Sequence, residues 1–447
     1  MADGEFGAPR RPNVDAANAN KRALANEQRL KALGEAVDRQ SGLTPKRARG
    51  RTGFRRPRNW FIGVGVVILL IVGVIGGGYL YANWRFGLIP KIKVSTEVKP
   101  ISGKPFNILM IGSDSRAGLT GAVAAQTGAS TGQAGGQRSD VVKIVHVDPQ
   151  AGTISMLSIP RDTMTTLLAN QALYGKFNRI NVNFGNGPSL LVQTITANFG
   201  IPINDTIVVS FAGMINAADA IGGVYLNFPY PAKDAFSGLN IPHAGCQRIA
   251  GFQALAVVRS RHYEWFEHGV WNFDVTSDFG RIWRQNVFLR GMVNRAKSLY
   301  NPITINSFLS KLPQGIALDT NFSLNELIGL AVKFHSINPA TIQTVTLPVA
   351  PGQYHGQDVE FVQQPLAQQV LVKIFGNQLI TPTNPPPNAL GQTPLPPHIA
   401  VPTTTTTLHH STTSVKHAGT TVVTHPTTTT TTPPEGDQYF DPTVCAP

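Results

Sequence analysis

Cysteine is nearly absent from this chain of 447 residues, which contains two, Cys246 and Cys445. Two cysteines so distant in sequence do not make a zinc site, because a structural zinc ion takes a cluster of such ligands. The order of serine, histidine and aspartate along the chain also gives no sign of a nucleophilic triad. Zinc chemistry and covalent catalysis by serine are therefore not supported.

Acidic residues are also few: 25 Asp and Glu stand against 38 Lys and Arg, a formal net charge of +13. Much of this excess lies in residues 1–59, where no apolar periodicity is sustained. This composition predicts a disordered basic arm. The arm has no helix-turn-helix pattern and no interleaved aromatic residues, so we expect no nucleic-acid partner. Anionic lipid headgroups account for its charge.

Charge is missing altogether from residues 60–84, "WFIGVGVVILLIVGVIGGGYLYANW". A run of this length and character spans a bilayer. Because Arg55, Arg56 and Arg58 stand directly before it, the positive-inside rule places the N-terminus in the cytoplasm. We therefore expect a single-pass protein of the cytoplasmic membrane, with a transmembrane helix over residues 60–84 and an extracytoplasmic domain after it. A cleaved signal peptide is the alternative, but the preceding arm is too long for one.

Residues 381–447 lack the apolar pattern of a core. Thr- and Pro-rich runs such as "TPTNPPPN" and "HPTTTTTTPPE" predict an extended low-complexity tail. The tail closes with "YFDPTVCAP", which includes Cys445. In an oxidising envelope a single pair of cysteines favours one disulfide, between Cys246 and Cys445. A free and buried Cys246 is the alternative.

Between residues 85 and 380, strands alternate with helices. The expected strands cover residues 106–112, 141–147, 153–159, 206–211, 223–228 and 341–348. The expected helices cover residues 188–199, 211–221, 250–258, 278–300 and 323–335. Such an alternation indicates a sheet with helices on both faces. We therefore predict an α/β fold, an α/β/α sandwich with a central mixed β-sheet, preceded by one transmembrane helix.

Charged residues gather at the ends of these strands. "IGSDSR" directly follows the first strand, "RSDVV" precedes the second, and "SIPRDT" ends the third. These motifs contribute Asp114, Arg116, Arg138, Asp140, Arg161 and Asp162. Any one of them alone is often a turn or a cap. Ligands in such folds bind beyond strand ends, so their concentration there indicates a binding site.

A pair of arginines occurs in "VVRSRHYEW", residues 257–265. If residues 257–261 form a strand, its period of two puts Arg259 and Arg261 on one face. Two parallel guanidiniums suit a phosphate or, less specifically, a pair of carboxylates. A solvated strand end is the alternative.

The segment "DFGRIWRQ" adds a third kind of feature, a helix N-terminus. Asp278 can cap this helix, and Arg281 and Gln285 share a face one turn apart. A helix N-terminus with an arginine in its first turn is an anion site. Two carboxylates elsewhere in the set suit Mg²⁺, and the arginines around it would neutralise a polyphosphate. Together these residues predict metal-assisted phosphoryl transfer.

In this order, the motifs resemble the LytR-CpsA-Psr family of membrane-anchored envelope phosphotransferases, in an actinobacterial-like form. The resemblance covers roughly residues 105–300 and fades beyond them. The matching pieces are "NILMIGSDSR", "RSDVVKIVHVDP", "ISMLSIPRDT", "KFNRINVNFGNGP", "AADAIGGV", "AGCQRIAGFQALAVVRSRH" and "DFGRIWRQN".

This resemblance implies transfer of a glycopolymer from a polyprenyl-pyrophosphate lipid to peptidoglycan, which forms a phosphodiester and leaves polyprenyl phosphate. By motif, Asp114 and Asp140 would bind Mg²⁺, with Mn²⁺ as an alternative. The residues that would bind the pyrophosphate and the lipid end are Arg116, Arg138, Arg161, Arg259, Arg261, Arg281 and Gln285. The catalytic candidates are Asp140, Asp162 and Arg161, and either aspartate would accept the proton of the sugar hydroxyl.

The family fold also implies a long apolar pocket for the polyprenyl chain. Its candidate lining residues are Phe177, Ile180, Phe199 and Phe211, for which ordinary core packing is the alternative. One departure from the family pattern is the Gly/Ala/Thr-rich insert "AGLTGAVAAQTGASTGQAGGQ" between Asp114 and Asp140. If the two aspartates share a metal, this insert must loop out beside the site.

Two other functions fit the same sequence. A lipid-pyrophosphate hydrolase would use the same residues with water as the acceptor. A non-catalytic wall-anchoring or regulatory membrane protein would fit the stalk-like tail. The intact set of Asp114, Asp140, Arg161 and Arg259 argues against this last function, because a pure binding protein has no need of it.

Overall fold

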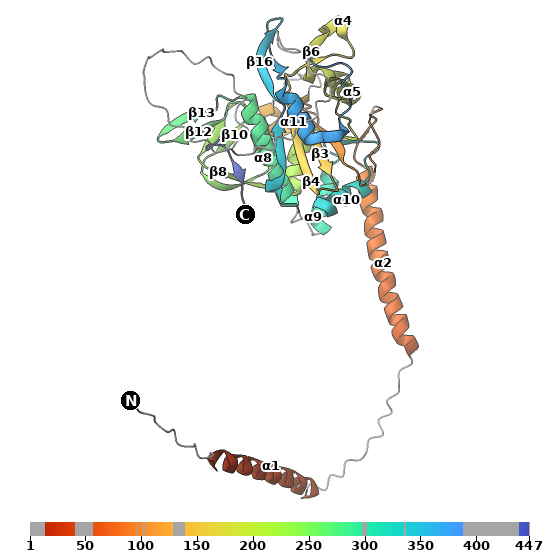
Figure 1. The fold of residues 1–447 in the computed structure, drawn as a ribbon, viewed down its shortest axis with the longest axis vertical. Helices are drawn as coiled ribbons and strands as arrows, with labels where there is room; N and C mark the ends of the chain where they lie inside the picture. The colour runs from red at the N-terminus through yellow and green to blue at the C-terminus, as the bar shows by residue number, and fades with distance from the viewer. Residues whose placement is uncertain are drawn as a thin grey trace, which may run out of the picture. The chain divides into compact units, whose positions relative to one another are not determined.

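The structure, a computed structural model, describes residues 14–40, 57–95, 97–101, 103–127, 139–296, 302–334, 337–387 and 438–446. The chain divides into two compact units, one that ends at Ile75 and one that begins at Gly76. In the first unit, helix α1 spans Val14–Gln40 (Figure 1). The predicted disordered arm is therefore wrong for these residues, whose Ala, Leu, Glu, Lys and Arg content favours a helix. The other parts of the predicted arm, residues 1–13 and 41–56, lie outside the described residues.

Helix α2 spans Pro57–Gly87 and includes the whole of the predicted membrane segment. In the part of the chain that the structure describes, no helix is both long and apolar enough to cross a bilayer. The transmembrane helix over residues 60–84 thus stays a prediction. The last turns of α2 pack on the following domain, where Phe86 is buried and the Tyr81 hydroxyl donates to Asn306 Oδ1 at 2.8 Å.

A central mixed sheet of seven strands has the order β1-β14-β7-β2-β3-β4-β15. Its strands are β1 (Lys91–Ile92), β2 (Phe106–Ser113), β3 (Ser139–Asp148), β4 (Thr153–Ile159), β7 (Asp205–Val209), β14 (Ile316–Asp319) and β15 (Gln343–Thr346). Strands β2, β3 and β4 pair antiparallel, whereas β7 runs parallel to β2 and β15 parallel to β4. The predicted strands at 106–112, 141–147, 153–159, 206–211 and 341–348 all belong to this sheet, which confirms the central mixed sheet.

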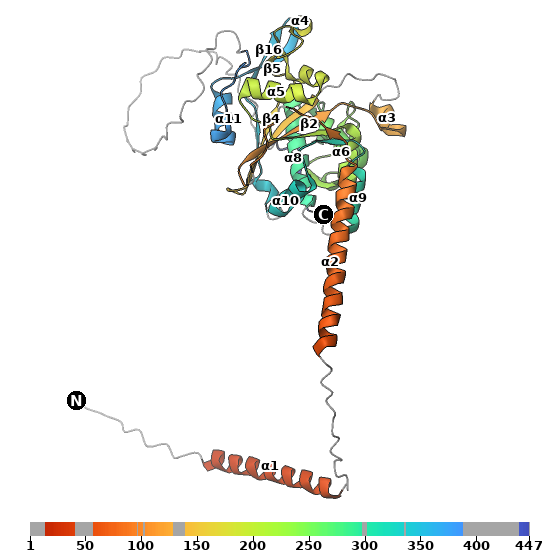
Figure 2. The ribbon, with the colours of Figure 1, turned by 90° about the vertical axis from the view of Figure 1, so that its right-hand side faces the viewer.

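Helices cover both faces of this sheet, as predicted. The helices are α3 (Gly121–Thr127), α4 (Gln171–Tyr174), α5 (Pro188–Phe199), α6 (Phe211–Ala220), α7 (Gly251–Arg259), α8 (Asp278–Ala296), α9 (Pro302–Lys311), α10 (Leu324–Phe334) and α11 (Leu366–Phe375). Figure 2 shows α5 and α11 on one side of strands β2 and β4, with α6 and α8 on the other. Leu109, Ile144 and Leu157 are fully buried in the core under α5 and α11, because they lie on the inner face of consecutive strands.

Smaller sheets surround the central one. A three-stranded sheet joins β8 (Val224–Phe228), β11 (Gly245–Ile249) and β18 (Thr443–Val444). The predicted strand at 223–228 is therefore present but lies outside the central sheet. A four-stranded sheet joins β9 (Ala232–Asp234), β10 (Leu239–Ile241), β12 (Glu264–Glu267) and β13 (Val270–Phe273). Two strand pairs complete the fold, β5 (Met164–Thr166) with β6 (Phe177–Arg179) and β16 (Val349–Tyr354) with β17 (Gln357–Val362).

The end of the chain returns to the domain. Strand β18 pairs antiparallel with β8, and a disulfide joins Cys246 to Cys445, as one of the two alternatives predicted. Phe440 stacks on Trp265 with a ring-centroid distance of 3.8 Å. Most of the predicted low-complexity tail, residues 388–437, lies outside the described residues. The terminal segment 438–446 is thus part of the folded domain.

Candidate active site

The two arginines of the "RSR" motif lie at the end of a helix, not of a strand. Arg259 is the last residue of α7, and Ser260 then adopts an extended conformation. The strand hypothesis for residues 257–261 is therefore wrong, because the short apolar run before Arg259 is helical and a run of this kind does not distinguish a buried helix from a strand. The expected helix over residues 250–258 is confirmed.

A buried carboxylate fixes the turn between these arginines. Asp234, at the end of β9, accepts hydrogen bonds from Ser260 Oγ at 2.7 Å and from the backbone N–H groups of Arg261 and His262 at 3.0 Å. Burial acts to raise the pKa of Asp234, but the hydrogen bond from Ser260 and those from backbone N–H groups outweigh it and hold the pKa below its usual value. Sequence reasoning did not single out Asp234, which is separated from the motif by strands β10 and β11 and helix α7.

Strand pairing brings Asp114 and Asp140 to the same edge of the central sheet. Ser113, the last residue of β2, pairs with Ser139, the first residue of β3, at a register shift after Gly112. Asp114 follows the one strand and Asp140 belongs to the other, so the two aspartates come from adjacent strand ends. The predicted insert between them contains α3, and its residues 128–137 lie outside the described residues. Arg138 also lies outside them.

Arg161 joins two of the predicted carboxylates. Its Nη1 lies 2.8 Å from Asp140 Oδ1, and its Nε lies 3.2 Å from Asp162 Oδ2. A second arginine, Arg179 on β6, pairs with the other oxygen of Asp162 at 3.4 Å. Burial opposes the charge of Arg161, but Asp162, Asp140 and Asp278 outweigh burial and raise its pKa. The "RSDVV" and "SIPRDT" motifs therefore form one charged cluster, as predicted.

The first turn of α8 contributes the next part of this cluster. Asp278 Oδ1 lies 2.9 Å from Arg261 Nη2 and 2.8 Å from Arg281 Nη2, so one carboxylate holds two arginines. Arg281 Nη2 also donates to the backbone oxygen of Asp140 at 3.1 Å. Gln285, one turn further along α8, donates to the backbone oxygen of Val258 at 3.0 Å. The helix face predicted to carry Arg281 and Gln285 thus lies against the "RSR" turn and the start of β3.

Positive charge is only partly compensated in this cluster. Burial lowers the pKa of Arg259, and the charges of Arg116 and Arg261 lower it further against the attraction of Asp140. Burial likewise lowers the pKa of Arg281 to about 10, although Asp278 acts in the opposite direction. Within the described residues, Arg259 Nη1 is buried and has no hydrogen-bond partner. A buried guanidinium nitrogen without a partner is costly, and an anionic ligand would satisfy it.

A cavity of about 250 Å³ begins at these charged residues and runs between the sheet and helices α6, α7 and α8. Its charged and polar end includes Asp140, Arg259, Arg281 and Gln285. Its walls are otherwise mainly apolar and include Met110, Ile207, Phe211, Met214, Leu289 and Met292. The geometry therefore suits a ligand with an anionic head and an apolar body.

Only one of the four predicted lining residues takes part in this cavity. Phe211 lines it and lies under Arg259, whose guanidinium carbon is 4.8 Å from the ring centroid. Ile180 and Phe199 belong to the core on the other face of the sheet, and Phe177 lies on β6. The alternative of ordinary packing is correct for Ile180 and Phe199.

Sequence reasoning also missed a lysine in the cavity wall. Lys143 on β3 is buried, and its Nζ donates to Ser158 Oγ at 2.7 Å and to Asn286 Oδ1 at 2.6 Å. The signal was a single lysine inside the mainly apolar strand 141–147. Lys143 thus places an amine, held by Ser158 and Asn286, in the wall of the cavity.

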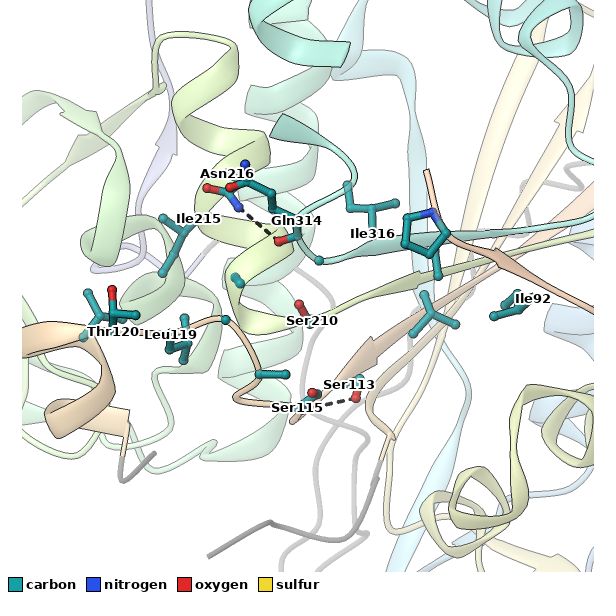
Figure 3. Close-up of a pocket in the computed structure, with 18 of the residues that line it drawn as sticks. Ile92, Ser113, Ser115, Leu119, Thr120, Ser210, Ile215, Asn216, Gln314 and Ile316 are labelled. Atoms are coloured by element: carbon teal, nitrogen blue, oxygen red, sulfur yellow. Dashed lines mark hydrogen bonds between the residues drawn. The ribbon is translucent and has the colours of Figure 1, made fainter. Parts of the chain in front are cut away.

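A second, larger cavity of about 730 Å³ lies on the opposite side of α6 (Figure 3). Asn216 on α6 donates there to the backbone oxygen of Gln314 at 3.1 Å, and Ser115 N donates to Ser113 Oγ at 3.2 Å. None of its lining residues in the described part of the chain is charged. Among these residues it therefore offers no charged side chain to neutralise a phosphate or to act as an acid or a base.

The donor set fits a hard divalent cation. Asp114 and Asp140 supply carboxylate oxygens from adjacent strand ends, which are the ligands that Mg²⁺ prefers. Among the described residues, no group of three or more His, Cys, Asp or Glu side chains is arranged to hold a metal. Two carboxylates are nevertheless enough for Mg²⁺, which usually keeps several waters and binds substrate phosphates.

The chain is similar to known proteins of one family. The LytR_cpsA_psr family model matches residues 89–375. The chain is 28% identical over 288 residues to the probable cell wall biosynthesis protein LcpB of Corynebacterium glutamicum, with 63% of this chain and 64% of that protein covered. It is 27% identical over 295 residues to the polyisoprenyl-teichoic acid–peptidoglycan teichoic acid transferase TagV of Bacillus subtilis, with 63% of this chain and 68% of that protein covered.

A solved structure shows the same fold. The LytR-Csp2A-Psr enzyme from Actinomyces oris aligns with a TM-score of 0.51 at 20% sequence identity, over 66% of this chain and 97% of that chain. The match to LcpB spans just under two thirds of the length of that relative.

Proposed function

This chain belongs to the LytR-CpsA-Psr family, and on that basis we propose that it is a glycopolymer transferase of the cell envelope. It would transfer a glycopolymer from a polyprenyl-pyrophosphate carrier to peptidoglycan. The name of the relative TagV, a polyisoprenyl-teichoic acid–peptidoglycan transferase, supports a donor and an acceptor of these classes. The predictions of a phosphotransferase and of these two partners are kept in this proposal.

One observation carries the proposal: an apolar cavity ends at a partly buried arginine cluster whose charge is incompletely compensated. Arg259 Nη1 lacks a partner among the described residues, and Arg281 lines the same end of the cavity. A polyprenyl pyrophosphate combines an apolar chain with a polyanionic head, so it matches both parts. Neither part alone would distinguish this ligand from a fatty acid or a free phosphate.

The arginines would stabilise the charge that moves during transfer. A sugar hydroxyl of peptidoglycan attacks the phosphorus that carries the glycopolymer, and the bond from this phosphorus to the bridging oxygen breaks. The electron pair leaves with polyprenyl phosphate, next to Arg259 and Arg281. Arg161, fixed by Asp140 and Asp162, would orient the phosphoryl group. Arg116 and Arg261 add positive charge beside Arg259.

Asp114 and Asp140 would hold Mg²⁺, with Mn²⁺ as an alternative. The bound cation would neutralise charge on the pyrophosphate oxygens. The position of the two aspartates on adjacent strand ends supports this assignment. Thermal unfolding of the chain with Mg²⁺, compared between wild type and Asp114→Asn, would test it independently of turnover, because a bound ion stabilises the folded state.

We also propose that the chain is anchored in the cytoplasmic membrane by residues 60–84, with its N-terminus in the cytoplasm. The uncharged run and the three arginines before it support this topology. A donor with a polyprenyl chain is itself embedded in a membrane, so an anchored enzyme meets it in two dimensions. Protease accessibility of N- and C-terminal tags in sealed vesicles would test the orientation.

The activity test uses the full chain in detergent, because segment 438–446 is part of the folded domain. The chain is incubated with a polyprenyl-pyrophosphate glycan, peptidoglycan oligomers and Mg²⁺, and the products are read by mass spectrometry. We expect a phosphodiester-linked conjugate and prenyl monophosphate. Free glycan phosphate without conjugate would instead identify a hydrolase. Bound but intact donor would identify a non-catalytic anchoring protein.

A further inference from the structure

The β16–β17 hairpin lies against the turn that carries Arg161 and Asp162. The backbone N–H of Glu360, on β17, donates to the backbone oxygen of Asp162 at 2.9 Å. Thr163 forms a parallel bridge with the same residue. These contacts fix Glu360 beside the charged cluster, although it lies beyond the part of the chain that resembles the family by motif.

A groove of about 350 Å³ lies between this hairpin and Asp162. Its lining residues include Asp162, Gln353, Asp358 and Glu360. Asp162 is bonded to Arg161, which is bonded in turn to Asp140 at the head of the apolar cavity. The ion pairs of Arg161 therefore connect the groove to the cavity, as the neighbouring sites of an acceptor and a donor must be.

Glu360 differs from the other carboxylates of the charged cluster in its partners. Asp140 and Asp162 bind Arg161, and Asp278 binds two other arginines. In contrast, Glu360 Oε2 is buried and has no hydrogen-bond partner among the described residues. An arginine partner stabilises the anionic form of a carboxylate and so makes it a weaker base.

We propose that Glu360 is the general base of the transfer reaction and accepts the proton of the acceptor sugar hydroxyl, which enters through the groove beside Asp162. This inference rests on the proposed function and assigns the proton to Glu360 in place of Asp140 or Asp162. The acceptor oxygen forms a bond to phosphorus as its proton passes to the Glu360 carboxylate. The bond to the bridging oxygen breaks, its electron pair leaves with polyprenyl phosphate, and Glu360 then releases the proton to water.

The electrostatics of the groove agree with this role. Burial raises the pKa of Glu360 to about 7, and the charges of Asp162 and Asp278 act in the same direction. Other charged groups around it are Asp358 on its own strand and the arginines bound to Asp162. A base with a pKa close to the working pH is both available and strong enough to take a proton.

The test compares full-length wild type with Glu360→Gln, which keeps the shape and the backbone contact to Asp162. Below pH 7 Glu360 is mostly protonated, so we expect the kcat of wild type to rise as the pH increases through about 7. In Glu360→Gln we expect kcat to fall about 100-fold and to lose this rise, with the affinity for the donor unchanged. Formate should restore part of the activity of Glu360→Ala, because a small carboxylate can occupy the vacated space.

The matched control is Glu264→Gln, which removes a carboxylate from β12 that is ion-paired to Lys233 at 3.2 Å. It should keep the wild-type rate and pH profile. A Glu360→Gln variant with the wild-type rate and pH profile would overturn the inference and leave the proposed function intact. Wild type that produces no conjugate would overturn the proposed function, and this inference with it.

Discussion

Arg284 and Asp441 form a buried ion pair, with Nη1 and Oδ1 2.7 Å apart, although 157 residues separate them in sequence. Arg284 is fully buried on α8, and Asp274, just before this helix, is its second partner at 2.9 Å. The neighbouring residue Gln285 lines the cavity. The C-terminal segment therefore supports the helix that carries part of the candidate site.

Removal of the Asp441 carboxylate should destabilise the domain. Loss of one partner from a buried ion pair typically costs about 3–5 kcal/mol, because a charge is left buried without compensation. Since Asp274 remains beside Arg284, we expect Asp441→Asn to lower the free energy of unfolding by about 3 kcal/mol. Urea unfolding measures this change. The control is Asp358→Asn, whose exposed side chain should have little effect; equal stability of the two variants would contradict the burial argument.

The disulfide between Cys246 and Cys445 should also help to hold the C-terminal segment on the domain. It closes a loop with a sequence separation of 199 residues, which restricts the unfolded chain strongly. We expect Cys445→Ser to lower the free energy of unfolding by about 3–5 kcal/mol. Reducing agent should lower the Tm of wild type to that of Cys445→Ser and leave the variant unchanged. A wild-type Tm that does not respond to reduction would show that the bond contributes nothing to stability.

The sequence predicted the elements whose signals are local. Strand 141–147 and helix 188–199 are correctly placed, because their apolar patterns and flanking residues lie within the elements themselves. Likewise, Arg161 and Asp140 were predicted to act together, because each follows or begins a strand of one sheet. The short run before Arg259 was ambiguous, since a buried helix and a buried strand are equally apolar.

Other parts of the site depend on contacts between distant segments and have no local signal. Asp234 fixes the turn that contains Arg261, but in the sequence it ends a three-residue strand that has no motif around it. Glu360 reaches the cluster only because the β16–β17 hairpin docks on Asp162. Asp441 stands at the end of a segment whose composition indicates no core. Each of these positions follows from tertiary packing, which one sequence does not display.

Arg259 should be important for activity but unfavourable for stability. Its guanidinium is buried above the Phe211 ring, and Nη1 has no hydrogen-bond partner within the described residues. Replacement by an apolar side chain of similar length removes a desolvated charge, so Arg259→Met should raise the Tm. The same variant should reduce transfer at least about 100-fold, because a group that stabilises the leaving phosphate is lost.

The control for this prediction is Arg248→Met. Arg248 is exposed, and its Nε donates to the backbone oxygen of Gly222 at 2.7 Å, away from the cavity. We expect no gain in Tm and a normal transfer rate. If Arg259→Met is less stable than wild type, Arg259 has partners that satisfy it in the free protein. Arg259 would then need no anionic ligand to satisfy it.

The pH dependence of stability should reveal a second group of buried acids, at the opposite end of β7 from the candidate site. Burial raises the pKa of Asp205 to about 7, and the charges of Asp319, Glu326 and Glu97 raise it in the same direction. Burial also raises the pKa of Glu97 to about 7, against a hydrogen bond from Thr206.

The sign of the effect follows from these raised values. In the unfolded chain Asp205 has its ordinary pKa of 3.8, so the folded state binds its proton more tightly. The stabilisation from this proton is fully present below that pH and is lost as the pH rises through about 7. Asp205→Asn cannot ionise and should therefore gain stability relative to wild type as the pH rises, by about 3 kcal/mol between pH 5 and pH 8.

Urea unfolding of wild type and Asp205→Asn at several values between pH 5 and pH 8 measures this difference. The comparison is made between the two proteins because other groups titrate in the same range, such as His146, whose pKa is lowered by burial. His146 is not among the groups that shift the pKa of Asp205, so its contribution is equal in both proteins and cancels, whereas Glu97 interacts with Asp205 and its titration is part of the measured difference. A difference that stays constant across this range would show that Asp205 is ionised in the folded state throughout, and that Asp319 and Glu97 do not oppose its charge.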